Sequence, residues 1–228
     1  MKNTFRLLFL TFVLCGLVVS SAEAGKIAPP SILTDSFDKY ELGILLGQNG
    51  WANYANGDAF MVESLSQKNK AVHVDSQSDN VITKTGVSLA DGRQAVMVKT
   101  DNRASWGNVP DGNVQVRISD ASWGAGTRRF VAVTFKADGN VAYYDKHADV
   151  YQNFGTYIDK QWTPLEIEWR SSDKTARYRV NNGVLTKAVW TDWMSFPQSD
   201  TFTSFNNVGF GFVQPSGGAG GVYFDNLK

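Results

Sequence analysis

The sequence lacks a second cysteine, and its only one, Cys15, lies in an apolar N-terminal stretch. Removal of that stretch leaves a chain without thiols, which excludes disulfide bonds and sites built from cysteine. An excess of charge of either sign is lacking too, since 22 basic side chains accompany 22 acidic ones. Proteins that bind nucleic acid or anionic membranes use a basic surplus, so we expect neither of these partners.

The first 24 residues have the three-part pattern of a signal peptide. Lys2 and Arg6 precede an apolar run at 7–19, and a small-x-small pattern for signal peptidase ends at Ala24. The run is shorter than the roughly 20 residues that a membrane-spanning helix needs, and the residues before the cysteine lack the small side chains of a lipoprotein signal. We therefore expect cleavage after Ala24, a linker at 25–34, no membrane insertion afterwards, and a secreted or periplasmic location.

Beyond the linker, short strand patterns follow one another with turns between them. They are rich in β-branched and aromatic residues and are separated by Asp-Gly, Asn-Gly, Gly-Gly or Ser-Asp pairs. The sequence contains no convincing amphipathic helix longer than two turns and no internal repeat. Residues 35–228 are therefore predicted to form one all-β domain, because a chain of this length can fold as a single unit. The predicted strands are 58–63, 70–75, 93–101, 113–119, 129–136, 140–145, 164–170, 175–180 and 206–213.

Apolar and charged residues alternate on both sides of a turn at 171–174, which predicts a hairpin with a defined register. In this register Glu168 lies opposite Arg177. Two residues further along, Glu166 lies opposite Arg179. Each cross-strand pair of opposite charges contributes roughly 0.2–1 kcal/mol, and a shift by one residue would expose the aromatic face. The pattern predicts strands with one buried and one solvated face, as in antiparallel sheets.

Two motifs at the ends of this domain indicate which sandwich it forms. SFDKYELGILLGQNGW (36–51) and GGVYFDNLK (220–228) enclose a KAVHV segment and a W…LEIEWR…ARYRVNNG block. This order resembles the concanavalin A-like lectin/glucanase superfamily, in particular its laminin-G-like domains of secreted bacterial proteins. The resemblance implies a two-sheet antiparallel jelly-roll sandwich whose first and last strands lie side by side. It leaves the function open, because the superfamily contains lectins, hydrolases, lyases and adhesion modules. The matching residues are Phe37, Asp38, Tyr40, Gly43, Gly47, Gln48, Gly50 and Trp51 at the start, and Tyr223, Phe224, Asp225, Asn226 and Leu227 at the end.

The residues give little support for catalysis. Several glucanases of the superfamily carry three acids on one strand face, because a nucleophile and an acid/base must lie about 5–5.5 Å apart. Here only Glu166 and Glu168 share such a face, and Arg170 takes the third position, so pairing of the two acids with arginines is favoured over catalysis. Lyases of this fold combine Gln or His with Arg and Tyr, but no motif joins such residues here. G-x-S-x-G and P-loop motifs are absent.

Aromatic residues are abundant, with seven Trp, eight Tyr and 14 Phe. Sugar rings stack on Trp and Tyr, while amides and Arg bind hydroxyl groups. The Gly-rich or polar surroundings of three tryptophans are typical of loops; each can instead pack beneath a loop, but we expect at least one exposed platform. We predict a non-catalytic, lectin-like domain for a glycan; the alternatives are a polysaccharide hydrolase or lyase, or an adhesion domain without glycan specificity. The candidate ligand-binding residues are Trp106, Gln115, Arg117, Trp123, Tyr144, Tyr151 and Trp193.

Three acids, Asp35, Asp38 and Asp225, would converge if the first and last strands pair. Ca²⁺ takes oxygen ligands of this kind. Domains of the family that the chain resembles often hold a structural Ca²⁺ near this point, through the closing aspartate and backbone carbonyls. The resemblance implies such a site at Asp225 and, less directly, at Asp35 and Asp38. The alternative is that Asp38 and Asp225 cap turns by accepting backbone N–H groups.

Overall fold

The computed structural model describes residues 29–55, 59–75, 80–107, 112–120, 130–145, 147–180, 188–196, 203–212 and 220–228. Its complete helical elements in these ranges are the short 3-10 turns η1 (Gln48–Gly50) and η3 (Arg103–Ser105). None of the helices in the described ranges has the length and apolarity to cross a membrane. The expected signal peptide and Trp123 lie outside the described residues.

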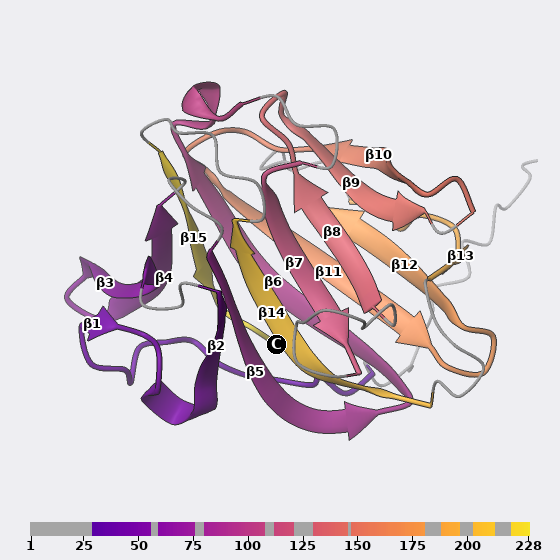
Figure 1. The fold of residues 1–228 in the computed structure, drawn as a ribbon, viewed down its shortest axis with the longest axis horizontal. Coiled ribbons are helices and arrows are strands. Elements are labelled where there is room, and N and C mark those ends of the chain that lie inside the picture. Colours follow the sequence, from indigo (N-terminus) through magenta and orange to yellow (C-terminus); the bar gives the residue numbers. More distant parts are fainter. Residues whose placement is uncertain are drawn as a thin grey trace, which may run out of the picture.

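Two antiparallel sheets stack face to face (Figure 1), which confirms the predicted all-β sandwich. The eight-stranded sheet consists, in spatial order, of β1 (Gly43–Ile44), β3 (Met61–Ser66), β4 (Asn69–Asp75), β15 (Gly221–Asp225), β6 (Asp91–Asp101), β11 (Trp162–Arg170), β12 (Thr175–Val180) and β13 (Met194–Ser195). The seven-stranded sheet consists of β10 (Val150–Thr156), β9 (Asn140–Asp145), β8 (Phe130–Phe135), β7 (Val114–Ser119), β14 (Phe205–Phe212), β5 (Asn80–Leu89) and β2 (Trp51–Ala55).

The core between the sheets is rich in aromatic side chains. Phe210 on β14 stacks on Phe224 of β15, with 4.2 Å between ring centroids, and so joins the two sheets. Tyr143 on β9 stacks on Tyr178 of β12 at 4.9 Å. Trp51 packs against Phe210 at 4.9 Å. All five side chains are buried, so part of the aromatic abundance serves packing rather than binding.

The predicted hairpin is confirmed, but one expectation about the sheets is wrong. β11 and β12 pair in the predicted register, and buried and partly exposed residues alternate along β11. β7 does not alternate, because all its residues are buried. Its outward side chains Gln115 and Arg117 lie against Tyr151 of β10 and Phe130 of β8, and these rings cover most of their surface.

Two segments that the sequence pattern does not predict as structured belong to the fold: part of the expected linker, and β5. Part of the expected linker packs on the sheets: Ile32 and Leu33 are buried, and the N–H of Val87 donates to the carbonyl of Ile32 at 3.1 Å. This close approach needs Gly86, where a Cβ would lie 2.2 Å from the Ile32 carbonyl oxygen. The strand that contains Gly86, β5, escapes prediction because Lys84 and this glycine interrupt its apolar pattern.

The first and last segments of the domain meet, as the resemblance implies. Asp35 and Leu227 exchange two backbone hydrogen bonds, of 3.0 and 2.8 Å. We term this junction the seam. The opening motif is closed by Gln48, whose Oε1 accepts the N–H of Glu41 while its Nε2 donates to the carbonyls of Glu41 and Ile44. The turn residues of the motif therefore fold it into a compact loop beside the last strand.

Candidate functional site

Four of the candidate ligand-binding residues meet on the outward face of the seven-stranded sheet. Gln115 on β7 donates from Nε2 to the hydroxyl of Tyr151 on β10 at 2.8 Å. The Tyr151 ring lies edge-on to Tyr144 of β9, with centroids 5.4 Å apart. The guanidinium of Arg117 lies 3.7 Å from the ring centroid of Phe130, which in turn contacts Tyr144 at 5.7 Å. We term these five residues the outward aromatic cluster.

Small side chains flank the polar members of this cluster. In the strand register Arg117 lies between Gly209 of β14 and Ala132 of β8. Gln115 lies beside Gly211 of β14. Arg117 and Gln115 each expose only 8% of their surface, so their polar groups are held in fixed positions. Groups fixed before binding lose little conformational entropy when a ligand arrives.

The loop between β9 and β10 supports the cluster from one side. The hydroxyl of Tyr144 donates to the carboxylate of Asp149. Asp145 accepts the backbone N–H groups of His147 at 2.8 Å and Ala148 at 3.3 Å, which forms a tight turn. Within the ranges that the structure describes, no three acidic or histidine side chains are arranged to hold a metal ion.

Of the tryptophans predicted as platforms, the two that the structure describes, Trp106 and Trp193, do not join the cluster. Trp106 is only 4% exposed and packs edge-on against Phe212 in the core, at 5.0 Å. Trp193 lies on the outward face of the other sheet, where its ring centroid is 3.8 Å from the guanidinium of Arg170. Trp123 falls outside the described residues. Among the described residues, Tyr144, Tyr151 and Phe130 are therefore the aromatic residues of this site.

Glu166 and Glu168, the weak catalytic candidates, form ion pairs on the outward face of the eight-stranded sheet. Glu166 contacts both Arg93 and Arg179. Glu168 accepts from Nη2 of Arg177 at 2.8 Å. Both carboxylates are thus already bonded to guanidinium groups. The geometry therefore favours the ion-pair interpretation of these acids.

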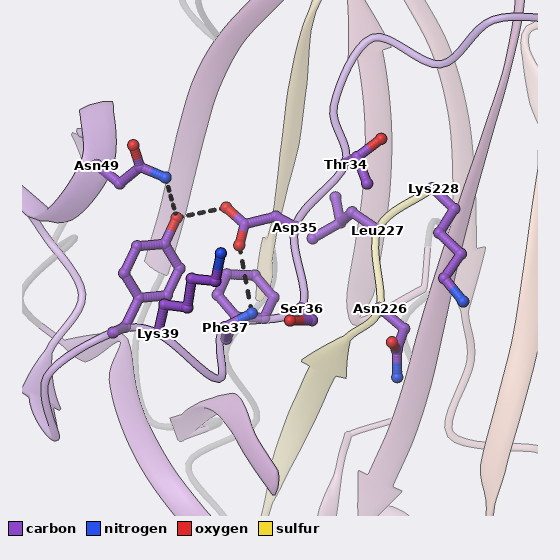
Figure 2. A pocket seen from close by; sticks show the side chains of 10 residues that line it. Thr34, Asp35, Ser36, Phe37, Lys39, Asn49, Asn226, Leu227 and Lys228 are labelled. Carbon is purple, nitrogen blue, oxygen red and sulfur yellow. Dashed lines mark hydrogen bonds between the residues drawn. The ribbon is translucent and has the colours of Figure 1, made fainter. Parts of the chain in front are cut away.

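Asp35 forms an ion pair at the seam with Lys84 of β5. The ammonium lies 3.0 Å from Oδ2, and the two side chains are 13% and 11% exposed. Tyr40 donates its hydroxyl to the same carboxylate and accepts from the Asn49 amide at 2.9 Å (Figure 2) and the Trp51 indole at 3.2 Å. The opening motif thus encloses an ion pair. A metal ion at Asp35 would meet this ammonium, so Asp35 does not fit a calcium site.

Asp225 on β15 is a different kind of acid. Its carboxylate is buried and accepts the backbone N–H of Asn226 at 2.7 Å and the side-chain amide of Asn226 at 3.1 Å. Burial, with smaller contributions from Asp38 and Asp35, raises the pKa of Asp225 to about 6. Asp38 itself accepts the N–H of Lys70 at 3.1 Å. A buried carboxylate near other acids attracts a proton or a cation, so the chemistry at Asp225 fits Ca²⁺.

The sequence alone does not single out Phe130 or Lys84. Phe130 lies within a predicted strand, and counting alternate residues from the buried Val131 would have placed it on the outward face. Lys84 gives no such signal, because its partner Asp35 lies 49 residues away in the chain.

Searches against protein families and against curated proteins find no match to the sequence. Several solved structures have a similar fold. A sialidase shares 12% identity at a TM-score of 0.60; the alignment covers 89% of this chain but only 18% of the sialidase chain. Lectin II from Ulex europaeus shares 10% identity at a TM-score of 0.52, over 87% of this chain and 99% of the lectin. The cellulose induced protein Cip1 shares 13% identity at a TM-score of 0.55, over 86% of this chain and 95% of that protein. Identities this low show similarity of fold alone.

Proposed function

We propose that this chain, which has the concanavalin A-like lectin/glucanase fold, is a secreted, non-catalytic domain that binds a glycan. The outward aromatic cluster carries the proposal, because it combines tyrosine rings with an amide and a guanidinium on one sheet face. These are the groups that contact the apolar faces and the hydroxyls of sugars. The occurrence of lectins and carbohydrate-active proteins among the similar folds supports a glycan as the ligand class.

Tyr151 is central to this proposal, since it contacts both Gln115 and Tyr144. Tyr151→Ala is expected to weaken glycan binding about tenfold, or 1.4 kcal/mol, because it removes a stacking ring and releases the Gln115 amide. Tyr151→Phe keeps the ring and should have a smaller effect. Calorimetric titration with β-glucan, alginate and galactan oligosaccharides measures both. Trp193→Ala, an aromatic truncation on the opposite sheet, is the matched control and should leave affinity unchanged.

The same glycan panel separates this function from its alternatives. Retention without new products is the expected result. Reducing ends would instead identify a hydrolase, and 4,5-unsaturated products would identify a lyase. A blank panel together with binding to itself or to a surface protein would identify an adhesion domain and overturn the proposal.

Asp225 provides a further test, because its chemistry fits a structural Ca²⁺ held by its carboxylate and by backbone carbonyls of the seam. An ion that binds only the folded chain adds RT ln(1 + [L]/Kd), about 2.7 kcal/mol at a hundredfold excess over Kd. At about 2–4 °C per kcal/mol, a chelator should lower the melting temperature by several degrees. Asp225→Asn should abolish that response, whereas Asp91→Asn, an acid at the far end of β6, should keep it. A melting curve that a chelator does not change would argue against the metal.

A further inference from the structure

Two hollows adjoin on the side of the molecule away from the outward aromatic cluster. The first, of about 350 Å³, lies at the seam between residues 34–40 and 226–228 (Figure 2). The second, of about 310 Å³, lies over Ala95, Met97 and Pro164, on β6 and β11 of the eight-stranded sheet. Asn226 and Lys228 line both hollows. Together they are termed the seam groove.

The side chains of the first hollow carry a surplus of positive charge. Lys39 and Lys228 line it as exposed ammonium groups. The one side-chain carboxylate in its lining, Asp35, is already bonded to the ammonium of Lys84. Asn49 also lines this hollow, and amides and ammonium groups supply hydrogen-bond donors. Asp38 and Asp225 lie nearby but line neither hollow.

The one side-chain carboxylate in the lining of the second hollow is also engaged by cations. Glu166 lines this hollow, and its single carboxylate is shared by the guanidinium groups of Arg93 and Arg179. Burial lowers the pKa of Arg93, and the charges of Arg179 and Arg177 lower it further against the opposing effect of Glu168. Glu166 is therefore already paired with cations, and the rest of this hollow offers the apolar side chains of Ala95, Met97 and Pro164.

We propose that the seam groove binds an anionic glycan, separately from the outward aromatic cluster. Its carboxylate or sulfate groups lie beside Lys39 and Lys228, where ammonium and amide donors are available. An apolar ring face lies over Ala95, Met97 and Pro164, in keeping with the apolar lining of most ligand sites. Because Lys39 and Lys228 are exposed, salt screens their attraction, so binding is expected to weaken as the salt concentration rises.

The test uses the full chain and three probes in a chelator-containing buffer: oligogalacturonate, a heparin-derived oligosaccharide and a neutral oligogalactan. Lys39→Gln combined with Lys228→Gln is expected to weaken binding of an anionic probe about tenfold or more, measured by calorimetric titration at low and at physiological salt. Lys68→Gln combined with Lys160→Gln is the matched control. It removes the same charge from exposed turns that line neither hollow.

Weaker binding with the first pair but not with the control pair supports the proposal, and the probe that responds identifies a carboxylate or a sulfate as the recognised group. Ala95→Trp, which fills the second hollow without a change in charge, should also weaken binding. Equal losses with both pairs, or no binding of either anionic probe, overturn the inference. Loss of anionic binding on Tyr151→Ala alone would place the ligand on the aromatic cluster; that result would support the proposed function and exclude the groove.

Discussion

Replacement of Lys84 by methionine is expected to lower the free energy of unfolding by about 3 kcal/mol. Methionine has nearly the length of lysine and keeps its apolar stem, but it leaves the carboxylate of Asp35 without its cation. The Asp35 side chain is only 11% exposed, so water replaces the lost ammonium incompletely, and a largely buried charge without a partner is costly. At about 2–4 °C per kcal/mol the melting temperature should fall by several degrees. Urea unfolding followed by tryptophan fluorescence measures the change.

The double variant Lys84→Met with Asp35→Leu is the control for this prediction. Apolar residues of similar volume often replace a buried ion pair at little cost, so the double variant should be more stable than Lys84→Met alone. A loss of less than about 1 kcal/mol in the single variant is typical of exposed ion pairs. Such a result would show that the seam is solvated.

Stability is expected to fall as the pH rises from about 4 to about 7, and Asp225 is the cause. In the unfolded chain an aspartate titrates near pH 3.9, whereas burial raises the pKa of Asp225 to about 6 in the fold. Between these values the folded chain keeps a proton that the unfolded chain has released. This contribution is fully present below about pH 4 and is lost above about pH 6. The difference between the two pKa values amounts to up to about 3 kcal/mol.

Asp225→Asn should remove this dependence and should raise stability at pH 7 relative to the parent chain. Chemical denaturation between pH 4 and 8 in a chelator-containing buffer measures both, because a bound cation would itself hold the carboxylate in its ionised form. Asp38→Asn, at a nearby exposed acid, is the control and should leave most of the slope in place. If the parent and the Asp225→Asn chain show parallel curves, the carboxyl is not perturbed by burial.

The parts of the fold that the sequence predicts are those encoded by neighbouring residues. The hairpin of β11 and β12 could be assigned with its register because Glu166, Glu168 and their arginines lie within one short segment. The seam could be predicted because each of its two motifs is a continuous stretch of sequence. Their pairing through Asp35 and Leu227 is confirmed. Local alternation thus specifies strands and hairpins, and motifs specify where the ends meet.

The parts that escape prediction depend on contacts between distant residues. Lys84 looks like a solvated strand residue until Asp35 is placed beside it. Trp106 lies in a stretch that is typical of a loop, yet Phe212 provides a core position for its ring. Alternation along β7 predicts a solvated face for Gln115 and Arg117, but the rings of Tyr151 on β10 and Phe130 on β8 lie against them. Alternation shows which face a side chain takes, but not what lies against that face.

The position of β15 has a consequence for how the chain reaches this fold. The strand formed by residues 221–225 lies between β4 and β6, in the middle of its sheet. Until β15 pairs with them, β4 and β6 each have an edge of unpaired N–H and C=O groups, and such edges promote association with other chains. Pairing over such a long sequence separation is also slow. A nascent chain that lacks these residues should therefore remain unfolded and depend on protection from aggregation, and folding should begin only after synthesis has passed residue 225.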